Sequence, residues 1–181
     1  MRGALAATRQ ALDLARTHKE EGHRAWALRL QGEIASRGAR PDVAKAEAAY
    51  LEAVALAERL GMRPLLALSR LGLARLHRRV GDRAKAEEHL SAAIAWLHQM
   101  DMPFWLEQAE GEIRELGGPF VVPGPNAELY RYLKRRFSGE ATVTILHDRR
   151  RGERRQRRAP HQPEGRRGER RRQAASAPSS L

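Results

Sequence analysis

The sequence predicts an all-α array of antiparallel helix pairs, a solenoid, followed by a small β-α-β segment and a disordered basic tail. Three observations predict this organisation. The chain matches itself when it is shifted by 40 residues, apolar residues within each period recur at the three-to-four spacing of helices, and the composition changes after Gly117-Gly118 and again at Asp148. We therefore divide the chain into a helical repeat domain, a β-α-β segment and an Arg-rich tail, at residues 1–117, 118–147 and 148–181.

The repeat is clearest in the second half of each period. Residues 42–62 (DVAKAEAAYLEAVALAERLGM) align without a gap with residues 82–102 (DRAKAEEHLSAAIAWLHQMDM). Residues 25–61 and 65–101 are identical at ten of 37 positions. A clustered match at one offset indicates one structural unit repeated along the chain.

Turn signals divide each period into two helices. Asp42 and Asp82 are natural N-caps, and Pro64 and Pro103 suit a first helical turn. Small residues at equivalent positions predict close helix contacts at Ala44, Ala46, Ala53, Ala84, Ala86 and Ala93. We expect helices at residues 3–20, 23–37, 43–60, 64–79, 83–100 and 103–116.

The second repeat carries a spacing known from one family of helical repeats. The pattern is Arg70-x2-Leu73-Ala74-x2-His77, then Gly81-Asp82, then Ala86-x3-Leu90-x2-Ala93. It resembles the tetratricopeptide (TPR) pattern W-x2-L-G-x2-Y followed by A-x3-F, although Arg70 and His77 stand at aromatic positions. A period of 40, rather than about 34, implies longer helices and a divergent TPR type.

A second resemblance covers residues 5–117. Segments such as AWALRLQGEIA, LGLARLHRRVGDRAKAEEHL and MDMPFWLEQAEGEIRELG are similar to the C-terminal TPR region of large bacterial signalling proteins. In those proteins a class III nucleotide cyclase or a regulatory domain precedes an AAA-type ATPase and a long TPR array. The resemblance implies a non-catalytic protein-binding module with a regulatory or scaffolding role in bacterial signalling.

The first predicted helix matches the second helix of a pair, because residues 10–16 align with residues 52–58. Without a partner helix before it, its apolar face is expected to be exposed, and the chain to self-associate through residues 3–20 or to dock there on an upstream repeat of a longer protein. The alternative is that it packs on residues 23–37 and leaves a modest surface. The face consists of Leu5, Leu12 and Leu14 with Ala4, Ala11 and Ala15.

The β-α-β segment is predicted from three short patterns. Residues 120–122 and 141–146 are the strand candidates. Between them Asn126 is a plausible N-cap, and an apolar stripe at every fourth residue indicates a helix, at Leu129, Leu133 and Phe137. Two strands are marginal alone, so the last repeat helix or a second chain is expected to cover them.

Residues capable of catalysis are few. The sequence has no cysteine, which excludes disulfides and thiolate sites, and its seven histidines form no pair at metal-ligand spacing. We therefore expect no enzyme activity, no cofactor and no bound metal. No uncharged apolar run approaches the roughly 18 residues of a membrane span, and the expected location is the cytoplasm.

The predicted binding surface is the groove lined by the first helix of each pair. Its candidate residues are Arg75, Arg78 and Arg79, which would meet the carboxylates of an extended acidic peptide, and Leu68 and Leu71 as apolar anchors. A solvated arginine face is the alternative, and for these three arginines it is the favoured interpretation. For the cluster of Trp96, Phe104 and Trp105, core packing is favoured over an aromatic ligand pocket, and packing is also the expected role of His77.

The tail offers a second hypothesis. Residues 148–181 carry 12 basic and 4 acidic side chains, against 18 and 16 in residues 1–117. Arginine runs bind nucleic acid or another polyanion without sequence readout, but interspersed glutamates and missing aromatic residues argue against specific nucleic-acid recognition. The candidate residues are Arg149, Arg150, Arg151, Arg154, Arg155, Arg157, Arg158, Arg166, Arg167, Arg170, Arg171 and Arg172.

Overall fold

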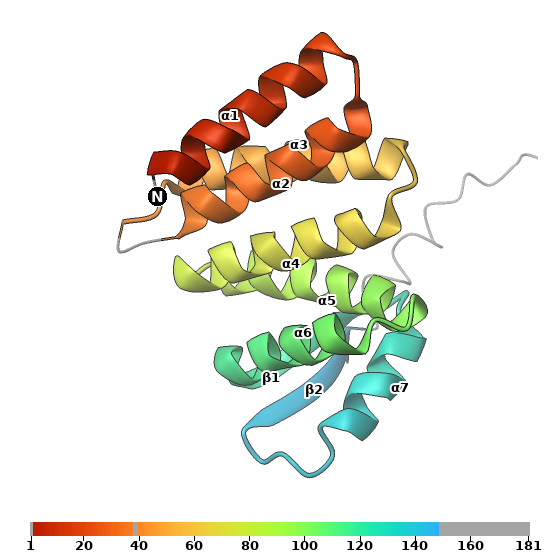
Figure 1. Cartoon of the computed structure of the whole chain (residues 1–181). Coiled ribbons are helices and arrows are strands. Elements are labelled where there is room, and N and C mark those ends of the chain that lie inside the picture. Colours follow the sequence, from red (N-terminus) through yellow and green to blue (C-terminus); the bar gives the residue numbers. More distant parts are fainter. Residues whose placement is uncertain (1, 38–39, 149–181) are drawn as a thin grey trace, which may run out of the picture.

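The computed structural model describes residues 2–37 and 40–148, and this part of the chain contains seven helices and one two-stranded sheet (Figure 1). The six helices of the predicted repeat region lie within a few residues of their expected ranges, and the β-α-β order that follows is also as expected. The elements are α1 (Arg2–Thr17), α2 (Glu21–Ser36), α3 (Val43–Arg59), α4 (Arg63–Arg79), α5 (Arg83–Gln99), α6 (Pro103–Leu116), β1 (Gly118–Pro123), α7 (Ala127–Arg136) and β2 (Val143–Asp148).

Consecutive helices from α1 to α6 lie antiparallel and side by side, and Figure 1 shows them following one another along the molecule. Each packs against the next one in the sequence. In addition, α2 contacts α4 and α4 contacts α6. Helices α2, α4 and α6 therefore lie side by side in a row of their own. The surface of this row is built from every second helix of the chain.

The turns that follow α1, α3, α4 and α5 share one hydrogen-bond pattern. In each, a backbone N–H just past the helix donates to the carbonyl five residues earlier, which satisfies a carbonyl left open at the helix end. The residue before the donor has positive φ in every case, at Lys19, Gly61, Gly81 and Asp101. The bonds run from Glu20 to Ala15, Met62 to Ala57, Asp82 to His77 and Met102 to Leu97.

The predicted N-caps of α3 and α5 are confirmed. The Asp42 carboxylate accepts from the Lys45 amide at 3.1 Å, and the Asp82 carboxylate accepts from the Lys85 amide at 3.2 Å. Pro64 and Pro103 lie in the first turns of α4 and α6, as expected. Asn126 precedes α7 but makes no side-chain capping bond.

Two groups of buried apolar residues form the interior. One joins α1 to α4, and the other joins α4 to α6 with β1, α7 and β2. Trp96 packs against both groups. The predicted close contacts are confirmed at four alanines and wrong at two: Ala46, Ala53, Ala86 and Ala93 are fully buried, whereas Ala44 and Ala84 are exposed.

Ala44 and Ala84 are exposed for a geometric reason. Each lies two residues before a buried alanine, and residues two apart on a helix point to different faces. The repeated Ala-Lys-Ala-Glu run therefore supplies one contact residue in each copy, not two. The sequence identity at the other position does not indicate burial.

The β-α-β segment packs against the helices before it. Strands β1 and β2 are parallel, with Phe120 opposite Ile145. Helix α5 contacts β1, and the buried side chains of Phe120, Val122 and Leu133 belong to the same apolar group as Ile113 of α6. Cover for the sheet thus comes from α5 of the same chain, and α6 contributes to the same apolar group.

The exposed face predicted for the first helix is only partly correct. Leu12 and Ala15 are buried, because α2 packs directly on that side of α1. Leu14 is 53% exposed, and Ala4 and Ala11 are exposed as expected. The prediction for the Leu5 side chain lies outside what the structure describes.

None of the helices in residues 2–37 and 40–148 combines the length and apolar character that a membrane crossing requires.

Candidate functional site

All five residues predicted to form the groove line one pocket of about 260 Å³ on the row of helices α2, α4 and α6. We call it the arginine pocket. Its walls come from α2 and α4, with one residue from α3 and one from α6. The lining residues are Arg29, Glu33, Ser36, Arg37, Tyr50, Leu68, Leu71, Gly72, Arg75, Leu76, Arg78, Arg79 and Trp105.

Tyr50 of α3 forms the floor of the pocket and is almost completely buried. Its ring lies between Gly32 of α2 and Gly72 of α4, which are equivalent residues of the two repeats. A Cβ on Gly32 would lie 2.9 Å from the ring, and a Cβ on Gly72 would lie 2.5 Å from it. Burial raises the pKa of Tyr50, an effect larger than the opposite one of its hydrogen bond with Ser36. The phenol is therefore neutral at physiological pH.

On the α4 wall, the predicted arginines are bound to carboxylates of α6. The Arg75 Nε donates to Glu112 at 2.7 Å, and the Arg78 Nε donates to the other oxygen of the same carboxylate at 2.8 Å. Arg78 also pairs with Glu115 at 2.7 Å. Arg79 reaches across the pocket and donates to the backbone carbonyl of Ser36. These residues thus hold α4 to α6 and α2.

The α2 wall carries two arginines that sequence reasoning missed. Arg29 and Arg37 both pair with Glu33, at 3.4 and 2.6 Å. The three residues are spaced by four, so they share one face of α2. This spacing, together with the match of Gly32 to Gly72, was the signal in the sequence that could have placed Arg29 and Arg37 in the pocket.

The arginine pocket has an excess of positive charge. Five arginines and one glutamate line it, and Glu112 and Glu115 border it. Each guanidinium has five N–H donors in a planar fork, so an ion pair with one carboxylate does not exhaust it. The arrangement therefore suits an anionic group that shares these donors.

Apolar surface in the pocket is limited. Leu68 and Leu71 lie in its wall as predicted, but both are buried, Leu71 to within 1% of its surface. Trp105 of α6 is half-buried and lines the pocket, and Phe104 contacts it edge-on at 5.2 Å between ring centroids. Packing, the favoured role, fits Trp96 and Trp105, whereas Phe104 is 63% exposed.

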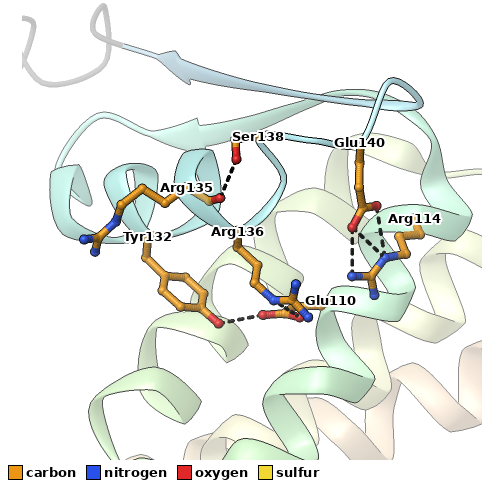
Figure 2. Close-up of polar contacts among 7 residues, drawn as sticks. All are labelled: Glu110, Arg114, Tyr132, Arg135, Arg136, Ser138 and Glu140. Carbon is orange, nitrogen blue, oxygen red and sulfur yellow. Dashed lines mark hydrogen bonds and ion pairs between the residues drawn. The ribbon is translucent and has the colours of Figure 1, made fainter.

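A second polar cluster, which the sequence did not predict, joins α6 to α7 (Figure 2). Glu110 is 2% exposed and accepts from the Tyr132 hydroxyl at 2.6 Å and from the Arg136 Nε at 2.9 Å. Burial raises the pKa of Tyr132, and the bond to the Glu110 carboxylate raises it further. Arg114 makes two-pronged contact with Glu140, at 3.0 to 3.2 Å. The cluster is a joint between the repeat region and the β-α-β segment.

His77 is buried, as expected for a packing residue, and stacks on His89 with 5.5 Å between ring centroids. The His77 Nε2 lies 3.5 Å from a Glu47 oxygen. Burial lowers the pKa of His89 to about 4, and the neighbouring His77 and Arg70 lower it in the same direction. Within residues 2–37 and 40–148, no three His, Asp or Glu side chains gather in a way that could hold a metal ion.

The twelve tail arginines, Arg149 to Arg172, lie outside the described residues. Comparisons with protein-family models, with curated proteins and with solved structures found no significant match. The described residues form a mostly helical protein with an arginine-lined pocket between alternate helices.

Proposed function

We propose that this protein is a non-catalytic binding module that holds an extended acidic segment of a partner protein in the arginine pocket. In this proposal the six helices are a divergent TPR-type solenoid, and the module is the regulatory or scaffolding part of a bacterial signalling system. The arginine pocket carries the proposal: five guanidinium groups converge between α2 and α4.

The geometry of the walls supports a peptide as the occupant. Glu33 and Glu112 each hold two arginines in fixed positions, on opposite walls of the pocket. A guanidinium whose orientation is already fixed loses little conformational entropy when it binds a carboxylate. Two such walls suit a chain that passes between them with acidic side chains on both sides.

The uncharged floor of the pocket also supports a peptide as the occupant. Tyr50 and Trp105 line the pocket with aromatic rings that carry no charge. An extended peptide alternates its side chains, so acidic residues directed to the walls leave apolar ones for the floor. We therefore expect peptides that alternate acidic and apolar residues to bind best.

The test is fluorescence anisotropy of a labelled peptide of alternating Glu and Leu, titrated with the full chain. Arg75→Gln combined with Arg79→Gln removes two pocket charges, and Glu112 keeps Arg78 as a partner. We expect this variant to bind at least about tenfold more weakly, the loss of one or two charge-assisted hydrogen bonds.

Arg16→Gln combined with Arg59→Gln is the matched control. It removes the same charge from two exposed ion pairs that lie outside the pocket. Equal affinity of the pocket variant and this control for the peptide would contradict the proposal.

The charge of the tail favours a second candidate, binding of nucleic acid or another polyanion. A full chain in which Arg154, Arg155, Arg157 and Arg158 are changed to Gln separates the two. If this variant alone loses the peptide, and with it labelled single-stranded DNA at low salt, the tail is the binding element.

A further inference from the structure

A second hollow lies between α1 and α2, next to the arginine pocket, and both are lined by Glu33 and Arg37. Its volume is about 460 Å³ and its lining is mostly apolar. We call it the α1 hollow. The lining residues are Ala4, Ala7, Thr8, Ala11, Ala27, Leu30, Glu33, Ile34 and Arg37.

The α1 hollow is the unfilled counterpart of a contact made elsewhere in the same chain. A shift of 42 residues, which aligns residues 10–16 with 52–58, places four of its α1 residues on four residues of α3. Those α3 residues are all buried, and α3 packs against α2. The pairs are Ala4 with Ala46, Ala7 with Ala49, Thr8 with Tyr50 and Ala11 with Ala53.

Thr8 on α1 stands at the position that corresponds to Tyr50 on α3, and its smaller side chain leaves this hollow open. The Tyr50 ring fills the space between α2, α3 and α4, and no aromatic side chain stands at the equivalent place on α1. The Thr8 hydroxyl donates to the Ala4 carbonyl at 2.8 Å, so it needs no partner from an occupant. The hollow is therefore able to receive a large apolar side chain.

Such side chains project from the neighbouring helix. Trp26 and Leu30 lie one turn apart on α2 and are 42% and 45% exposed. Leu30 also borders the α1 hollow. One surface thus carries both a hollow and the large side chains that fit one. In a dimer with a two-fold axis this contact forms twice, because the large side chains of each copy lie in the hollow of the other.

We propose that the occupant of the α1 hollow is a second copy of this chain, whose Trp26 and Leu30 lie against Ala7 and Ala11. Charge does not oppose this contact. The rim carries both signs, at Glu33 and Arg37, so a two-fold axis can set each beside its opposite.

The size of the face sets the expected affinity. Helices α1 and α2 have 16 residues each, about 24 Å in length and about 10 Å across. Two such helices side by side present a face of about 500 Å², and a dimer would bury about 1,000 Å² in total, at the low end for specific interfaces. We therefore expect a weak dimer, with a Kd in the micromolar range.

Sedimentation equilibrium of the full chain over micromolar concentrations tests the proposal. Wild type is expected to dimerise, and Ala7→Arg, which puts a charged side chain in the hollow, is expected to be monomeric. Ala44→Arg is the matched control, since Ala44 is also an exposed helical alanine but lies outside the hollow. Circular dichroism checks that both variants remain helical. Leu12 is unsuitable for this test because it is buried.

Disulfide trapping tests the reciprocal contact, because the chain has no cysteine of its own. Equal amounts of Ala7→Cys and Leu30→Cys are mixed and oxidised. We expect mixed dimers to exceed the yield of Ala44→Cys mixed with Leu30→Cys. The proposal is overturned if wild type stays monomeric through the micromolar range, or if the Ala7→Arg variant dimerises like wild type. The occupant of the hollow would then be a helix of another protein.

Discussion

Tyr50 shows how much of the site depends on single residues. It is buried between Gly32 and Gly72, which match each other at the 40-residue offset. The sequence match indicated that these glycines were equivalent, but it did not reveal their common contact. That contact depends on the position of α3 between α2 and α4, which is a tertiary feature.

The first prediction concerns Gly72→Ala. In an open helical position this change adds stability of up to about 1 kcal/mol. Here the new Cβ would lie 2.5 Å from the Tyr50 ring, so we expect a loss of about 1 to 3 kcal/mol through overpacking. Urea unfolding followed by circular dichroism measures it.

Gly111→Ala is the control for that change, because nothing lies within 4 Å of a Cβ at Gly111. It is expected to leave stability unchanged or to raise it. If both substitutions stabilise the protein alike, Tyr50 does not pack between the two glycines.

The second prediction concerns pH and His89. Because the pKa of His89 in the folded protein is about 4, below the usual 6.5 or so, the unfolded chain takes up a proton at higher pH than the folded one. His89 therefore leaves the free energy of unfolding unchanged above about pH 6.5 and lowers it as the pH falls from there toward 4. The loss is on the order of 2 kcal/mol.

His89→Gln should reduce that part of the pH dependence, measured as urea midpoints between about pH 4 and 7. His18→Gln, which removes a histidine side chain at an exposed position, is the control and should keep this part of the wild-type pH profile. A His89→Gln profile with the wild-type slope would show that His89 titrates normally in the folded protein.

At the scale of elements, the sequence predicted what local chemistry determines. The caps at Asp42 and Asp82, the prolines in the first turns and the glycine turns all depend on a few neighbouring residues, and each is present. The side of a helix that is covered was less predictable. Leu12 was expected on an open face, yet α2 covers it.

The joint between α6 and α7 is an element-scale feature that sequence reasoning could not find. Glu110 and its two partners are 22 and 26 residues apart in the chain, and no repeat or motif links them. Only the return of α7 against α6 makes Glu110 a buried acceptor. Without the fold, charged residues on a helix are interpreted as a solvent-exposed face.

The third prediction is that Glu110→Ala loosens this joint. The change leaves the Tyr132 hydroxyl without its partner, which costs about 1 to 3 kcal/mol, whereas Arg136 is half exposed and can turn to water. We expect lower global stability and faster amide hydrogen exchange in α7 than in α3. Glu107→Ala, an exposed change one turn earlier on α6, should alter neither; equal exchange in all three proteins would mean that the joint does not hold α7.

At the scale of the whole molecule, order along the chain determines which surfaces meet. Alternate helices form the row that carries the arginine pocket, so residues 40 positions apart, such as Ser36 and Leu76, lie on its two facing walls. The sequence repeat therefore predicted the location of the pocket on α4. It did not predict the role of α6, whose Glu112 holds Arg75 and Arg78, because α6 has no matching copy within the aligned repeats.

The most direct test of the account is an NMR titration of the isotope-labelled full chain with the alternating Glu and Leu peptide. If the arginine pocket binds the peptide, the largest shifts will fall on the Gly72 amide, the Trp105 indole and the Arg75 Nε, with small changes at the Gly111 amide on the same molecule. Shifts confined to the arginines of residues 149–172, with the Gly72 and Trp105 signals unmoved at saturation, would contradict the central claim that this pocket is the binding site.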